Sequence, residues 1–263
     1  MLSRQMSDSA MVFLLLPGLF LCILLFIEIG RRVGTRRVAE ETERARVVLN
    51  TIETAIYALL GLMIAFTFSA AASRFDTRRT LTVQETNAIG TAYLRLDLLP
   101  AAAQAPLREK FRRYTEARIA VYQALPDVQA SNKHADRACA LQTEIWREAV
   151  AALKDAQAAS SLVVLPALNE MIDITTTRAM IAKTHTPPIV LATLFVLALL
   201  CSLLIGNGLG RERTFGVGIR TFGFALVFTL TMYVIFDLDH PRVGFIRLDY
   251  VDQALTDVLA GMK

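Results

Sequence analysis

Apolar residues along the chain gather in four long blocks, and polar residues fill the stretch between the second and the third. The blocks are residues 11–29, 55–72, 188–206 and 214–236. A helix needs about 20 mostly apolar residues to cross the hydrocarbon layer of a membrane, which is ~30 Å thick. Each block has nearly that length or more, and a helix satisfies its own backbone groups inside lipid. The pattern therefore predicts four membrane-spanning helices.

The first block has a second interpretation as a signal peptide, because it follows a basic residue, Arg4. A signal peptide has an apolar run of roughly 7–15 residues and a cleavage site of small residues. The run here is longer and ends in Glu28-Ile29-Gly30-Arg31-Arg32. We therefore expect a retained helix.

The region between the second and third blocks has the apolar spacing of helices, with residues recurring every three or four positions. The spacing predicts that the second helix continues as far as Pro100, that another helix lies between Pro106 and Pro126, and that two more cover 135–158 and 162–182. The expected fold is an all-α membrane protein with four transmembrane helices and a helical extramembrane bundle inserted between helices 2 and 3.

The expected organisation has four parts. Residues 1–72 hold the first two spanning helices, 73–186 the extramembrane bundle, 187–236 the last two spanning helices, and 237–263 an amphipathic C-terminal tail.

Arginines in the short connections predict the orientation of the chain in the membrane. Arginine-rich short loops stay in the cytoplasm, whereas long loops count little. The rule places the middle region on the periplasmic or extracellular side. Three arginines after the second block, on the opposite side of the membrane, argue for the reverse. The connections carry Arg31, Arg32, Arg36, Arg37, Arg44 and Arg46, and Arg211 and Arg213; the opposing residues are Arg74, Arg78 and Arg79.

Composition excludes several classes of protein. A net charge of +4 is small for a nucleic-acid-binding protein, and the basic residues are not interleaved with aromatic ones. The glycines of GNGLG (206–210) follow no strand, so we interpret them as a flexible loop rather than a phosphate cradle. We expect no enzyme activity, catalytic residues, cofactor, metal or nucleic acid, because the cysteines and histidines are scattered: Cys22, Cys139, Cys201, His134, His185 and His240.

Three charged residues lie in or beside the apolar blocks, where a charge is costly and needs a partner or a function. Glu28 ends the first block, Glu53 precedes the second, and Arg220 lies near the start of the fourth. Arg220 has three possible roles. It extends to the lipid headgroups, pairs with Glu28 or Glu53, or faces a water-filled path as an anion ligand.

Charged residues also follow the second and fourth blocks on one side of the membrane. They form either a collar of interfacial salt bridges or the mouth of an ion path, and they are too few for a calcium site. The predicted collar consists of Arg74, Asp76, Arg78, Arg79, Asp237, Asp239 and Arg242, with His240 beside it.

Small residues recur at every fourth position of the second block, at Gly61, Ala65, Ser69 and Ser73. Such a stripe lets another helix approach closely. It either packs within one subunit or faces a symmetry axis, where it lines a pore beside Phe66 and Phe68.

Three stretches together resemble the bacterial bestrophin-like domain family of integral membrane proteins. They are LLGLMIAFTFSAAASRFDTRR (59–79), ETNAIGTAYLRLDLLP (85–100) and FDLDHPRVGFIRL (236–248). The resemblance covers nearly the whole chain. Its signature falls on Arg74, Asp76, Arg78, Arg79, Glu85, Asn87, Gly90, Asp97, Asp237, Asp239, Pro241, Arg242 and Gly244.

The resemblance implies a homo-oligomeric channel for small ions, with anions favoured. It also implies a multi-pass protein of the bacterial inner membrane, whose partner is the lipid bilayer. Bestrophins keep their large domain in the cytosol, which is opposite to the orientation that the arginines predict. The alternative function is a membrane-anchored sensor or scaffold whose helical domain binds a ligand or partner, because helical bundles of this kind also occur in bacterial sensors.

Overall fold

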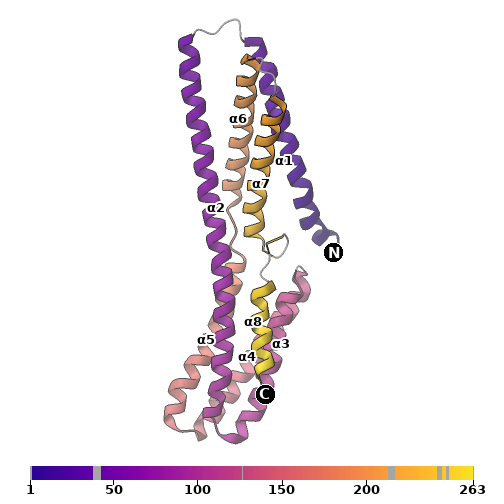
Figure 1. The fold of residues 1–263 in the computed structure, drawn as a ribbon. Coiled ribbons are helices and arrows are strands. Elements are labelled where there is room, and N and C mark those ends of the chain that lie inside the picture. Colours follow the sequence, from indigo (N-terminus) through magenta and orange to yellow (C-terminus); the bar gives the residue numbers. More distant parts are fainter. Residues whose placement is uncertain are drawn as a thin grey trace. The chain divides into compact units, whose positions relative to one another are not determined.

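The computed structural model is helical throughout the part of the chain that it describes (Figure 1). It describes residues 2–37, 43–125, 127–212, 217–241, 245–246 and 249–262. Side chains are described for 16–36, 47–125, 127–210, 218–219, 221–241, 245–246 and 253–262. The α-helices are α1 (Leu2–Arg37), α2 (Glu43–Leu94), α3 (Ala101–Gln123), α4 (Val128–Ala152), α5 (Ala158–Ala182), α6 (Pro188–Glu212), α7 (Val217–Asp239) and α8 (Asp249–Gly261), and the short 3₁₀ helices are η1 (Arg95–Leu98) and η2 (Leu153–Asp155).

Four helical segments among the described residues are long and apolar enough to cross a membrane, as judged by length and composition. Two of them, Val47–Leu98 and Pro188–Gly210, contain the predicted second and third spans, and a further one, Thr221–Asp239, contains residues 221–236 of the predicted fourth span. The fourth is Ala158–Ala182, which is α5 and which we expected in the extramembrane bundle. The first predicted span lies in α1, where the side chains of its residues 11–15 are outside the described set.

The chain divides into two compact units. Unit 1 comprises Met1–Ser73 and His185–His240, and unit 2 comprises Arg74–Thr184 and Pro241–Lys263. Helix α2 contributes its first part to unit 1 and its last part to unit 2, and α5 belongs to unit 2.

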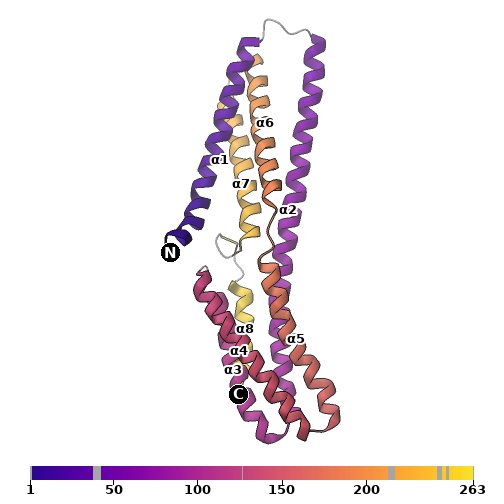
Figure 2. The same cartoon turned by 180° about the vertical axis from the view of Figure 1, so that it is seen from behind.

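Unit 1 is built on the packing of α1 against α6 (Figure 2). Its apolar core takes residues from four helices: Ile23 and Ile27 of α1, Leu60 of α2, Leu194, Ala198 and Cys201 of α6, and Ala225 and Phe228 of α7. Helix α7 also packs against α1. The helical segments that correspond to the four predicted spans therefore form one cluster within unit 1.

Glycines allow α1 and α6 to approach each other with their backbones in contact. A Cβ atom placed on Gly206 would overlap the carbonyl oxygen of Ile27, and one on Gly30 would overlap the carbonyl oxygen of Leu203. Gly34 and Gly210 are equally close to the opposite helix. Each helix thus contributes a Gly-x-x-x-Gly pair, a pattern typical of close helix crossings in membranes. The prediction of a flexible loop at 206–210 is wrong, because these residues lie inside α6.

Unit 2 packs α3, α4, α5 and α8 with the last part of α2 around one apolar core. Fully buried side chains at its centre are Ile89, Phe111, Tyr114, Ile145, Leu168, Met171 and Leu255. Helix α8 packs against α3, and Arg112 of α3 donates a hydrogen bond to the backbone oxygen of Met262 at 3.0 Å. The C-terminal segment is therefore part of this core.

Three helices of unit 2 begin earlier than their apolar spacing predicts, and one of them is α5, which begins at Ala158 rather than at 162. Helix α3 begins at Ala101, directly after Pro100, and contains Pro106 in its second turn. Helix α4 begins at Val128 because the side chain of Asp127 caps it, accepting hydrogen bonds from the backbone N–H groups of Gln129 and Ala130 at 3.0 and 3.1 Å.

Candidate functional site

The predicted small-residue stripe lies on an exposed face of α2. Gly61, Ala65 and Ser69 are all exposed, and a Cβ atom added to Gly61 would meet no atom within 4 Å. Phe66 and Phe68 beside them are 65% and 42% exposed. Among the residues that the structure describes, no other helix covers Gly61, Ala65 or Ser69.

The residues that α2 buries in unit 1 lie on its opposite side. They include Leu60, Thr67 and Ala71, and the partly buried Ile56 and Met63 pack beside them. Only 17% of the spanning window of α2 is buried, against 28% in α6 and 33% in α7.

The exposed face also carries small and hydroxyl-bearing residues one to three turns before the stripe. Thr51, Thr54, Ala55 and Ala58 are exposed there. Because residues at i and i+4 share a side of a helix, these positions extend the stripe towards the start of α2. The result is a long exposed face with small side chains along its centre, beside which large apolar groups such as Leu62, Phe66 and Phe68 are also exposed.

The structure describes the side chains of Glu28 and Glu53, the two residues predicted as ion-pair partners of Arg220. Glu28 accepts hydrogen bonds from Arg31 and Arg32 of its own helix, with Nε distances of 2.8 and 2.9 Å. Glu53 is half-buried on α2. Arg220 lies in α7, but its side chain is outside the described residues, so its pairing and its role as an anion ligand stay predictions.

The structure assigns the predicted collar to both units. Arg74, Asp76, Arg78 and Arg79 lie on α2 in unit 2, and Asp237 and Asp239 lie at the end of α7 in unit 1. Arg78 is buried and donates a hydrogen bond to the backbone oxygen of Thr184 at 2.6 Å, while Asp76 and Arg79 are exposed. Asp237 and Asp239 are both buried. Arg242 lies outside the described residues, and the meeting of the two halves stays a prediction.

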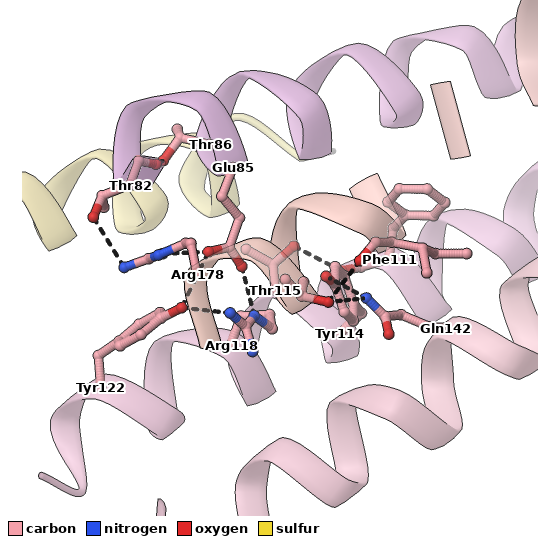
Figure 3. Close-up of polar contacts among 12 residues, drawn as sticks. Thr82, Glu85, Thr86, Phe111, Tyr114, Thr115, Arg118, Tyr122, Gln142 and Arg178 are labelled. Carbon is pink, nitrogen blue, oxygen red and sulfur yellow. Dashed lines mark hydrogen bonds and ion pairs between the residues drawn. The ribbon is translucent and has the colours of Figure 1, made fainter. Parts of the chain in front are cut away.

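A buried ion cluster in unit 2 connects α2, α3 and α5 (Figure 3). The carboxylate of Glu85 has no exposed area, and it lies between the guanidinium groups of Arg118 and Arg178. The Nε of Arg118 donates to Glu85 at 2.5 Å, and Arg178 donates both to Glu85 and, at 2.9 Å, to the hydroxyl of Thr82.

Tyr122 completes this cluster. Its hydroxyl donates to Glu85 at 3.1 Å and accepts from Arg118, and the guanidinium of Arg178 lies over its ring at 4.1 Å from the centroid. A cation over an aromatic face is attracted by the ring's quadrupole. The two arginines and one carboxylate leave a net positive charge, and their contacts hold the three helices together.

The surroundings determine the protonation of Glu85. Burial raises the pKa of its carboxyl group, but the charges and hydrogen bonds of Arg118 and Arg178 outweigh burial, so that the pKa lies below its ordinary value. Glu85 is therefore ionised at neutral pH. Among the motif residues of the sequence, Glu85 was singled out only through the family resemblance. Glu85 lies at helical spacing from Thr82, Ile89 and Leu96, and all four residues are buried. This spacing is the signal in the sequence that could have identified Glu85 as a charged residue of the core.

Two histidines that we expected to be scattered lie together in unit 1. His185, Asp239 and His240 each offer one ligand atom, and these three atoms lie within 4.8 Å of one another. Of the described residues, this group has the composition and spacing of a possible metal site.

The chain was compared with known families and structures. The family model described as the Bestrophin-like domain matches residues 18–252. Solved structures of variants of a bacterial bestrophin homolog from Klebsiella pneumoniae have the same fold. One is 14% identical with a TM-score of 0.69, and covers 94% of this chain and 98% of its own. A second is 14% identical with a TM-score of 0.64, and covers 92% and 99%. None of the curated protein sequences compared with the chain matches it.

Proposed function

Because the chain belongs to the bestrophin-like family, as its motifs predicted, we propose that it is a homo-oligomeric membrane channel for small anions whose pore is lined by α2. The observation that carries this proposal is the exposed face of α2, with Gly61, Ala65 and Ser69 at its centre. The spanning helices of unit 1 lie in the bacterial inner membrane. Unit 2 projects from the lipid, on the periplasmic side that the arginine-rich connections favour.

A face of small and hydroxyl-bearing residues is poorly suited to lipid. Small residues are enriched where membrane helices approach each other, and polar groups at membrane depth face other helices or water. Closed symmetry turns the same face of every copy towards one axis. The α2 helices of several copies then surround a path lined by Ala65 and Ser69, and Phe66 and Phe68 lie on either side of this lining.

Positive charge favours anions on this path. Arg74, Arg78 and Arg79 follow the proposed pore segment of α2, where they raise the local concentration of anions. Arg220, near the start of α7, supplies a fixed charge on the other side of the membrane.

Chloride flux through liposomes that contain only the purified protein tests this proposal. We expect flux above that of empty liposomes, a reduction of at least tenfold for Arg220→Ala, and nearly normal flux for Arg220→Lys, because lysine keeps the charge. The absence of any anion flux from correctly folded protein, or equal flux in Arg220→Ala and the wild type, would contradict the proposed anion pathway.

A further inference from the structure

From the described contacts of His185, Asp239 and His240, we propose that these residues form a binding site for a divalent transition-metal ion of the Zn²⁺ class. The site connects the residue stretch that precedes α6 with the end of α7, both within unit 1. It does not depend on whether the protein conducts ions.

A hydrogen bond to the backbone orients His240 for a metal, and a second one sets the tautomer of His185. The Nδ1 of His185 lies 3.2 Å from the backbone oxygen of Asp239, and the Nδ1 of His240 lies 3.1 Å from the backbone oxygen of Phe236. A carbonyl oxygen only accepts, so each Nδ1 carries the proton, and the lone pair of the neutral ring is on Nε2. Metal-binding histidines usually have this arrangement, in which the second nitrogen donates to a carbonyl or carboxylate.

The third ligand is oriented in a similar way. Oδ2 of Asp239 accepts a hydrogen bond from the backbone N–H of Thr186 at 2.6 Å, and the Asp239 side chain is buried. This contact fixes the carboxylate beside the two imidazoles. Two nitrogen ligands and one oxygen ligand suit Zn²⁺ or a similar ion, whereas Ca²⁺ and Mg²⁺ prefer oxygen ligands alone.

Metal binding requires one imidazole to rotate. The rings of His185 and His240 are stacked, with centroids 4.7 Å apart and planes at 4°, and Phe236 stacks on the other side of His240 at 4.2 Å. A metal lies close to the plane of each imidazole that binds it, so it cannot bind two stacked rings at once. His185 is exposed and lies between α5 and α6, so its ring is the one that turns, and in turning it gives up the hydrogen bond of its Nδ1 to the backbone oxygen of Asp239. The bound ion then replaces the ring stack and ties the ends of α6 and α7 together.

The test measures Zn²⁺ binding to the full chain in detergent, with the purification tag removed and bound metal stripped by a chelator. Calorimetry is expected to show one Zn²⁺ per chain, and Co²⁺ in its place is expected to give the visible absorption of a low-symmetry site with nitrogen ligands. His185→Gln and His240→Gln should each weaken Zn²⁺ binding by at least tenfold, whereas Ca²⁺ and Mg²⁺ should not bind at this site.

Two matched variants separate this site from other ligands in the chain. His134→Gln removes a histidine of α4 in unit 2, and Cys139→Ser removes an exposed thiol, so both should bind Zn²⁺ as the wild type does. Zn²⁺ binding that persists unchanged in both His185→Gln and His240→Gln would overturn the proposal, as would a folded wild type that binds no Zn²⁺.

Discussion

Replacing Gly206 by alanine is expected to lower the stability of unit 1 more than the same change at either of the other glycines of α6, Gly208 and Gly210. The new Cβ would overlap the carbonyl oxygen of Ile27, which is backbone, so the two helices have to move apart. Forcing a group into a tightly packed site costs about 1–3 kcal/mol. At about 2–4 °C per kcal/mol for a chain of this size, we expect the apparent melting temperature to fall by roughly 2–12 °C. The melting temperature is measured in detergent by size-exclusion chromatography after heating.

Gly208 provides the matched control in the same helix. A Cβ atom there meets no atom within 4 Å, and alanine is a better helix former than glycine by about 1 kcal/mol. Gly208→Ala should therefore leave the melting temperature unchanged or raise it by a few degrees. Equal stability of the two variants would show that α1 and α6 do not cross at Gly206.

Replacing Glu85 by glutamine is expected to destabilise unit 2 strongly. The change leaves the buried guanidinium groups of Arg118 and Arg178 without their counter-charge. Removing one partner of a buried ion pair typically costs about 3–5 kcal/mol, because the remaining charge is still buried. Circular dichroism of the full chain during chemical denaturation measures the loss. Glu144→Gln, which removes an exposed partner of Lys110, is the control and should change the unfolding midpoint little.

The stability of the protein at acid pH provides a second test of the role of Glu85. Its pKa in the folded protein is below the ordinary value of 4.5, so its contribution to stability is complete above that pH and is lost as the pH falls through the folded-state pKa. Wild-type stability should therefore fall on acidification below pH 4.5, and Glu85→Gln should lack this part of the fall. If the variant and the wild type had the same stability at neutral pH and the same acid dependence, Glu85 would not be the buried counter-ion of the two arginines.

The helical fold was predictable because the apolar blocks are long and uninterrupted, as in 188–206, where no charged residue occurs. Helix ends were less predictable. Asp127 caps α4 several residues before the apolar stripe begins, and a cap depends on one side chain rather than on a periodic pattern. The glycine crossing was missed because glycines at the end of an apolar block suggest a loop. Only the partner pair on α1, Gly30 and Gly34, shows that Gly206 and Gly210 belong to a helix contact.

The candidate site was predictable where the relevant residues share one helix. The stripe of Gly61, Ala65 and Ser69 follows from spacing alone, but its exposure depends on which face of α2 the other helices cover. The proximity of His185 to His240 could not be predicted, because these residues are far apart in the chain and come together only through the fold of unit 1, in which α6 and α7 both pack against α1. Family membership and an all-helical fold follow from longer patterns and were predicted correctly.

The most direct test of the proposed pore is the effect of a polar thiol reagent on chloride flux through a channel with one cysteine in α2. With Cys22, Cys139 and Cys201 replaced, Ser69→Cys places the thiol on the small-residue face, and Ala70→Cys places it on an exposed position about 100° further round the helix. The account predicts that the reagent abolishes most of the flux in Ser69→Cys and leaves Ala70→Cys unaffected. Flux that is unaffected in Ser69→Cys, or blocked only in Ala70→Cys, would contradict a pore lined by this face of α2.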